Sequence, residues 1–107
     1  MAKYLLVYSG GSMPETQAEQ AAVMKEWETW MGGLGSALVD PGNPFTPAVK
    51  SIAPGGKVSD GSALGGMASG YSILQADSLD AAASMAKSCP VLKGGAHISI
   101  YETFNVM

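Results

Sequence analysis

The fold of this chain is decided by residues 70–102, which read GYSILQADSLDAAASMAKSCPVLKGGAHISIYE. The β-forming run over residues 67–76 predicts a strand. Asp77 or Ser78 then caps a helix, and Asp80 lies in its first turn, where the helix dipole favours an anion. The block therefore begins as a strand followed by a capped helix.

The end of the same block is equally well marked. Pro90 forbids continuation of the helix, and Gly94-Gly95 turns the chain into a last strand over residues 96–103. Alternation along that strand sets Ile98 and Ile100 on one face and His97, Ser99 and Tyr101 on the other. The helix is expected to bury a stripe of mostly small side chains: Leu79, Ala82, Ala83, Ala86 and Cys89.

A first strand is predicted over residues 3–9, KYLLVYS, and both of its faces are apolar. Leu5 and Val7 occupy one face, whereas an antiparallel sheet with one solvated face should alternate apolar and polar residues. The chain has enough helices to cover one face only. A partner subunit is the simplest cover for the second face, so we expect a homodimer.

A first helix is announced by the capping pattern of residues 12–15, SMPE, with Pro14 in the first turn. Gly32-Gly33 is expected to end it, and a short strand over residues 35–40 follows. The apolar side chains recur at steps of three and four residues and predict a stripe that faces the sheet: Met24, Trp27, Met31 and Leu34.

Residues 41–66 are rich in proline and glycine. Within them, residues 48–52 and 57–59 are expected to pair as a short hairpin around Pro54-Gly55-Gly56. The whole order is strand, helix, strand, hairpin, strand, helix, strand. It predicts a single α+β domain over residues 1–107 with the ferredoxin-like split βαβ arrangement and two helices on one face of an antiparallel sheet.

Composition excludes several function classes. The net charge is -3, and the six basic residues, all Lys, are too scattered to track a phosphate backbone, so no nucleic-acid partner is expected. No apolar run reaches the length of a membrane helix and no secretory signal is recognised, so a cytoplasmic protein is expected. One Cys and one His form neither a disulfide nor a zinc cluster, and no phosphate-loop motif is present. No metal or cofactor is therefore predicted.

With these residues in view, the chain resembles the YCII-related (DGPF-type) domain family over nearly its whole length. The resemblance rests on five segments: KYLLVYSGG, the W-x-x-W-x-x-x-L spacing of residues 27–34, VSDG at residues 58–61, ADSLDAAASMAKSCP, and the closing glycine pair with its strand. It implies a dimeric α+β barrel.

The chain also departs from that family. The family's Asp-Gly-Pro-Phe signature here reads Asp60-Gly61-Ser62-Ala63. The enzymatic branch is thought to use a histidine near the start of the chain with an Asp partner, but the first eighty residues here contain no His. That dyad is not carried over.

His97 is the candidate for general acid/base chemistry, because an imidazole exchanges protons near neutral pH. Asp60 is its first candidate partner, with Asp40 and Glu28 as further possible orienting carboxylates. The alternative is a histidine held inside an interface with no chemistry. Asp60-Gly61 likewise either faces a ligand at the mouth of a pocket, as the family signature suggests, or simply forms the turn that ends the hairpin.

Candidate ligand-binding residues are aromatic, together with the loop glycine. Trp30 lies off the main helix stripe and is the pocket or interface candidate, whereas Trp27 is assigned to the core. Tyr71 and Tyr101 are placed to donate hydrogen bonds, and Gly61 belongs to the family's signature loop. Cys89, at a helix C-terminus, is expected to be an inert packing residue.

Two functions remain in view. The first is a homodimer that binds a small molecule, or is purely structural, without the family's dyad. The second is a cofactor-independent enzyme of lyase, isomerase or dehydrochlorinase type that acts on a small cyclic or aromatic substrate, with His97 as acid/base. A module that accompanies another enzyme is a third possibility.

Overall fold

The computed structural model describes residues 2–11, 15–63 and 68–106. Two α-helices, six strands and two 3₁₀ turns follow one another in these residues: β1 (Ala2–Gly10), α1 (Gln17–Leu34), a 3₁₀ turn (Gly35–Ala37), β2 (Leu38–Asp40), β3 (Lys50–Ile52), β4 (Val58–Asp60), β5 (Ala68–Ala76), α2 (Leu79–Ala86), a 3₁₀ turn (Pro90–Gly94) and β6 (Ala96–Glu102).

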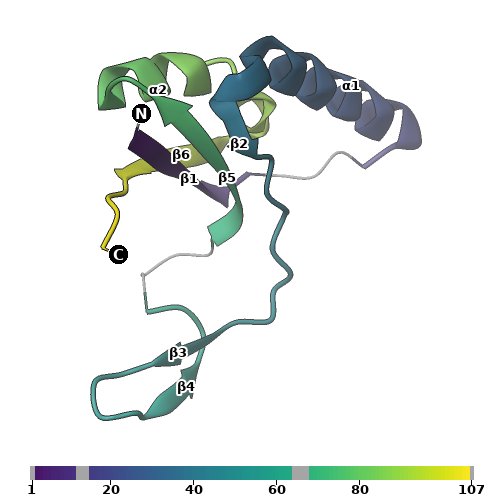
Figure 1. The fold of residues 1–107 in the computed structure, drawn as a ribbon. Helices are drawn as coiled ribbons and strands as arrows, with labels where there is room; N and C mark the ends of the chain where they lie inside the picture. Colours follow the sequence, from purple (N-terminus) through teal and green to yellow (C-terminus); the bar gives the residue numbers. More distant parts are fainter. Residues whose placement is uncertain (1, 12–14, 64–67, 107) are drawn as a thin grey trace.

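Four of the strands form one antiparallel sheet in the order β2-β5-β1-β6, and β3 and β4 form a separate two-stranded sheet. Both central strands, β5 and β1, are nine residues long. Figure 1 shows α1 and α2 on the same side of the four-stranded sheet, with β3 and β4 standing away from it. The split βαβ arrangement with two helices on one face is therefore confirmed.

The core lies between this sheet and the helices. Tyr4, Leu6 and Tyr8 of β1 alternate into it, and Ser72 and Leu74 of β5 meet them from the neighbouring strand. Helix α2 contributes Ala82 and Ala86, whose small side chains are buried. The sequence predicted a buried stripe of mostly small side chains for this helix, and the burial of these two alanines agrees with it.

Helix α1 begins and ends later than the sequence pattern predicts. Residues 12–14 lie outside the described residues; the cap is Thr16, whose hydroxyl accepts a 3.1 Å hydrogen bond from the Glu19 amide. This is a capping box shifted along the chain. The two glycines 32 and 33 lie inside the helix, because packing carries it on to Leu34, and Gly35, at a φ of 54°, ends it.

The buried stripe of α1 is also different from the predicted one. Met24 is 60% exposed, while Trp30 is the buried residue of this helix and Trp27, Met31 and Leu34 pack partly against the core. In α2, Leu79 is 46% exposed although it was expected inside. Leu79 is the first residue of α2, and Met24 lies in the N-terminal half of α1, whereas the residues of α1 that pack against the core lie from Trp27 onward.

Two further boundaries differ from the predicted ones: a 3₁₀ turn takes up the first half of the strand expected over residues 35–40, and α2 ends at Ala86. Ser78 caps α2 by accepting a hydrogen bond from the Ala81 amide, and Gly95 in the left-handed region leads into β6. Cys89 is buried, as expected, but it precedes the 3₁₀ turn that starts at Pro90 rather than ending α2. No helix in the described part of the chain is long and apolar enough to cross a membrane.

Candidate functional site

The face of the sheet that the helices leave uncovered is the first candidate. Strand pairing aligns Leu5 with Ile73 and Tyr101, and Val7 with Tyr71 and Ser99. Because side chains alternate along a strand, these residues point away from Tyr4, Leu6 and Tyr8 and share one surface. We call the surface made by Leu5, Val7, Tyr71, Ile73, His97, Ser99 and Tyr101 the open face.

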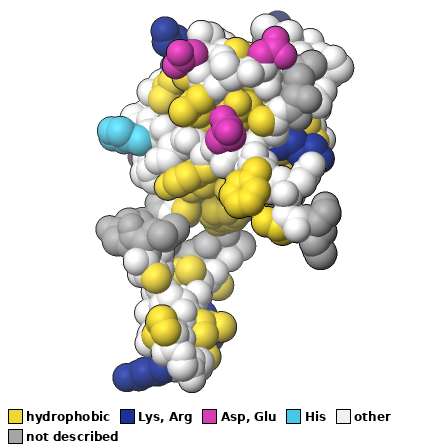
Figure 2. Space-filling model, turned by 60° about the vertical axis from the view of Figure 1, so that its left-hand side comes forward, with side chains coloured by type: hydrophobic (Ala, Val, Ile, Leu, Met, Phe, Trp, Pro, Cys, Tyr) yellow, Lys and Arg dark blue, Asp and Glu magenta, His cyan; other side chains and the backbone are white. Residues whose placement is uncertain are grey.

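The open face is apolar at its centre and aromatic at its margins. Leu5, Val7 and Ile73 are half-buried. No element of the described chain lies over them in the way that the helices lie over the other side of the sheet. Tyr101 is 56% exposed. Figure 2 shows hydrophobic side chains gathered on the body of the molecule and others along the part that projects from it. An antiparallel sheet with a solvated face is normally polar there, so this surface requires a cover.

Tyr71 has an aromatic neighbour that the sequence did not reveal. Phe45 stacks on it, with ring centroids 5.8 Å apart and an interplanar angle of 22°. The Phe45 amide donates a 2.8 Å hydrogen bond to the Ser69 carbonyl, which holds the Pro-rich segment alongside β5. Phe45 lies in a segment without periodicity, so the sequence did not predict a role for it. It meets β5 only through contacts between residues far apart in the chain.

His97 lies at the end of β6 nearest to the glycine turn, opposite Ser9 of β1. Its side chain is exposed and shares the open face with Ser99 and Tyr101. Within the described part of the chain, no carboxylate hydrogen-bonds to it or forms an ion pair with it. The imidazole is therefore free to meet a ligand or a partner chain but is not oriented by a residue of its own chain.

Asp60 and Gly61 lie elsewhere. Asp60 ends β4, where its Oδ1 is 2.8 Å from the Lys50 Nζ, and its side chain is 90% exposed. Gly61 has a φ of 91° and donates its amide hydrogen to the Val49 carbonyl. Figure 1 places β4 away from the sheet that contains β6, so one chain does not bring Asp60 and His97 together.

The other two carboxylates considered with His97 have different surroundings. Asp40 Oδ1 accepts a 2.8 Å hydrogen bond from the Gly42 amide and so shapes the turn after β2. Glu28 is exposed on α1, which covers the opposite side of the sheet. The structure therefore leaves the orienting partner of His97 unassigned within one protomer.

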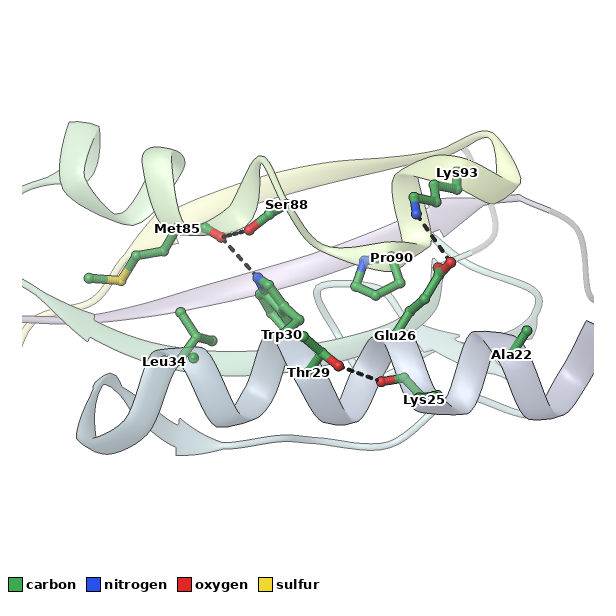
Figure 3. A pocket seen from close by; sticks show the side chains of 11 residues that line it. Ala22, Lys25, Glu26, Thr29, Trp30, Leu34, Met85, Ser88, Pro90 and Lys93 are labelled. Atoms are coloured by element: carbon green, nitrogen blue, oxygen red, sulfur yellow. Dashed lines mark hydrogen bonds and ion pairs between the residues drawn. The ribbon is translucent and has the colours of Figure 1, made fainter.

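Trp30 belongs to a second surface, an open groove of about 720 Å³ between α1 and the segment that follows α2. Its Nε1 donates a 2.9 Å hydrogen bond to the Met85 carbonyl, and its ring meets Trp27 edge-on. An ion pair between Lys93 and Glu26 crosses the groove, as Figure 3 shows. Trp30 is thus mainly a buried bridge between the helices, and only its margin lines this groove.

The covered side contains a buried polar chain that sequence reasoning missed. The Tyr8 hydroxyl donates to Ser72 Oγ at 2.7 Å, and Ser72 Oγ donates to the Pro41 carbonyl at 2.8 Å. The Cys89 thiol lies 3.9 Å from the same Tyr8 oxygen. Burial raises the pKa of the Tyr8 phenol well above its ordinary value, and burial likewise raises the pKa of the Cys89 thiol. Both groups stay protonated, which suits packing rather than nucleophilic chemistry.

Metal chemistry has no support in the described ranges. Among residues 2–11, 15–63 and 68–106, no three His, Cys, Asp or Glu side chains gather in a way that could hold a metal ion. The groups able to act on a ligand at the open face are the two phenols, a serine hydroxyl and the imidazole. They can donate or accept hydrogen bonds and, at His97, transfer a proton.

Comparison with known proteins supports the fold. The chain is similar to the solved structure of a 5-chloro-2-hydroxyhydroquinone dehydrochlorinase from Burkholderia phenoliruptrix in complex with 2,5-dihydroxybenzoquinone, with a TM-score of 0.52 and 16% identity. The likeness covers 94% of this chain and 93% of that one. The likeness supports the ferredoxin-like α+β fold that the sheet and its two helices define.

Sequence comparisons add no narrower assignment. No protein-family model matches the chain. No curated protein matches it in sequence. Membership of the YCII-related family consequently stays a prediction from the residues that carry the resemblance.

Proposed function

We propose that the protein is a homodimer that binds a small planar organic compound between the open faces of its two subunits. The observation that carries this proposal is the open face itself, an apolar sheet surface with aromatic margins that neither helix of the described residues covers. A second copy supplies a surface of the same character, because the contact surfaces of a two-fold dimer are self-complementary.

The composition of the open face favours a planar ring as the ligand. Leu5, Val7 and Ile73 form an apolar floor, and the stacked rings of Phe45 and Tyr71 offer a flat aromatic surface beside it. Polar groups at Tyr101, Ser99 and His97 lie along the neighbouring strand. An apolar pocket with a few polar groups is the usual arrangement around a small organic ligand. The quinone bound to the structurally similar dehydrochlorinase suggests a first compound to try.

Two measurements test the proposal. Sedimentation equilibrium at micromolar concentration should give a dimer, and titration calorimetry should detect 2,5-dihydroxybenzoquinone at one or two sites per dimer. Replacing Tyr71 by Leu removes the stacked ring and should weaken binding about two- to tenfold, in the range of an aromatic contact. Thr29→Ala, on the outer side of α1, is the matched control. A stable monomer, or equal binding by Tyr71→Leu, would refute the proposal.

An enzyme is the second candidate, and His97 supports it. His97 is the single imidazole of the chain, exposed on the open face, and the similar structure is that of a dehydrochlorinase. Here a proton from one hydroxyl would move to the chlorinated ring carbon as the ring takes its keto form. His97 would then accept a second hydroxyl proton while chloride leaves that carbon, so that one hydrogen chloride is lost and a hydroxyquinone remains. The carboxylate that orients the imidazole would come from the partner subunit, since no carboxylate among the described residues bonds to it.

Chloride release separates the two functions. The wild-type protein is incubated with 5-chloro-2-hydroxyhydroquinone and compared with His97→Gln, and Lys93→Ala provides a control remote from the open face. Enzyme function predicts turnover that His97→Gln abolishes while the dimer persists. Ring binding without chloride release by the wild type would leave the binding function alone.

A further inference from the structure

Strands β3 and β4 form an arm that projects from the body of the molecule. The arm comprises residues 49–61: two short strands joined by a turn in which the Ala53 amide donates to the Lys57 carbonyl at 2.8 Å. Figure 1 shows this arm at a distance from both helices and from the four-stranded sheet. An isolated two-stranded hairpin is marginally stable in water, so an ordered arm needs a surface to pack on.

One face of the arm has the chemistry of a contact surface. Strand pairing sets Ile52 opposite Val58 and Lys50 opposite Asp60, so these four side chains share a face, while Ser51 and Ser59 occupy the other. Ile52 is 69% exposed and Val58 is 54% exposed. The exposed Lys50–Asp60 ion pair beside them contributes little stability. The arm therefore presents an apolar cross-strand pair that its own chain does not cover.

The root of the arm is held firmly against β5. A Cβ at Gly42 would lie 1.7 Å from the Tyr71 carbonyl oxygen, so the backbones are in direct contact there, and φ at Gly42 is 72°. Ser72 Oγ binds the Pro41 carbonyl, and Phe45 pairs with Ser69. These contacts hold the chain that leads to the arm up to Phe45, which limits the freedom of the arm and so lowers the entropy lost on association.

The size of the exposed surface points to a second copy as the partner. The accessible surface is 7531 Å², whereas a compact monomer of this mass exposes about 5,600 Å². The radius of gyration is 15.3 Å, against about 13 Å for a compact domain of this length. The excess of roughly 1,900 Å² falls within the area that one subunit of a large permanent dimer buries. A small ligand covers far less.

We propose that the arm is a clasp that lays Ile52 and Val58 against the second copy of the chain. Two-fold symmetry makes the contact reciprocal, so each dimer contains two clasps and four clasping side chains. This inference rests on the homodimer of the proposed function and adds to the contact between the open faces. The dimer would then depend on a segment whose removal leaves the core of each protomer intact.

The test compares two double variants that differ only in the face of the arm they alter. Ile52→Ser with Val58→Ser removes the apolar pair, and Ser51→Ala with Ser59→Ala changes the opposite face of the same strands. Sedimentation equilibrium over a dilution series gives the dimer dissociation constant. We expect the first variant to weaken the dimer about 100-fold, because four apolar contacts are lost per dimer. The second should change it less than about threefold.

Hydrogen exchange supplies an independent measurement. The arm amides of the wild type should be protected in the dimer and lose protection on dilution below the dissociation constant, whereas amides of β1 and β5 should persist. A dissociation constant unchanged by Ile52→Ser with Val58→Ser overturns the clasp but leaves the dimer of the proposed function standing. A wild-type protein that stays monomeric overturns both.

Discussion

The two faces of the four-stranded sheet differ in what lies over them. On β5, Leu74 is fully buried between the sheet and the helices, whereas its neighbour Ile73 points to the other side and is only half-buried. On β1, Leu6 is likewise fully buried, and its neighbour Leu5 on the other side is half-buried. The side chains are of similar polarity on both sides. The contrast teaches that the sequence is apolar on both faces of the sheet, whereas the two helices cover one of them.

The largest effect expected from this contrast is on the free energy of unfolding. Leu74→Ala should cost about 4 kcal/mol, because a fully buried Leu loses its transfer free energy and leaves a cavity. Ile73→Ala, one residue away on the open face, should cost the isolated protomer about 1 kcal/mol. Urea denaturation of dilute samples measures both. Equal losses would mean that the two faces are not distinguished as described.

A smaller loss is expected where the arm leaves the body. Gly42→Ala combines a positive φ with a clash against the Tyr71 carbonyl and should destabilise the fold by about 3 kcal/mol. Gly55→Ala, in the turn of the arm, has a positive φ of 96° but open space around its Cβ, and should cost about 1 kcal/mol. The difference in stability between the two variants, measured by thermal denaturation, reports the contact between Gly42 and the Tyr71 carbonyl. If Gly42→Ala were as stable as Gly55→Ala, that contact would be disproved.

The buried phenol of Tyr8 predicts a loss of about 1 kcal/mol in Tyr8→Phe, since a buried hydrogen bond to Ser72 disappears. Tyr101→Phe, on the open face, should change the stability of the protomer by less than about 0.5 kcal/mol. Chemical denaturation at pH 7 compares the two variants.

The same phenol predicts an alkaline effect. Burial raises the pKa of Tyr8 above its ordinary value of 10.0, so the folded state holds this proton in a pH range where the unfolded chain has released it. Its contribution to stability is complete below about pH 10 and is lost as the pH rises above that value. The wild type should therefore lose stability more steeply above pH 10 than Tyr8→Phe. Parallel pH profiles would contradict this.

The last comparison concerns how fast a disulfide reagent reaches a thiol on the covered side, and it requires no change in stability. Cys89 is buried and its pKa is raised by that burial, so a disulfide reagent at pH 8 should modify it only as fast as the fold opens. A thiol placed on the exposed side of α2 by Ser84→Cys, in a Cys89→Ala background, should react at least about 100 times faster. Rapid reaction of native Cys89 would show that the covered face is accessible.

Sequence reasoning succeeded where short-range signals are strong. The Ser78 cap and the glycine turn into β6 determine local backbone conformation, and each lies where the pattern placed it, whereas α2 ends at Ala86, before it reaches Pro90. It was less successful on α1, where tertiary packing carries the helix through two glycines and makes Trp30 rather than Met24 the buried residue. Helix periodicity indicates that a stripe exists, but the neighbouring elements decide which part of it is covered.

The residues of the candidate site also fall into those that a local pattern predicted and those that it did not. Alternation along β6 placed His97 and Tyr101 on one face, because side-chain direction in a strand is a local property, whereas strand pairing through β1 adds Tyr71 to that face. Asp60 was one of three carboxylates considered as the partner of His97, and the structure instead gives it Lys50 as its partner on the arm. The Phe45–Tyr71 stack and the Tyr8–Ser72 hydrogen bond join residues far apart in the chain, and no local pattern contains that information.

The sequence by itself determined the order of the elements, their caps and the apolar character of both faces of the sheet, because these follow from residue type and spacing. Only the tertiary structure decided which face the helices cover, which tryptophan is buried and where the arm points. Those features depend on contacts between segments distant in the chain, such as the approach of Gly42 to the Tyr71 carbonyl. The stretch over residues 70–102 fixes the shape of this protein, and the open face and the arm decide what can bind to it.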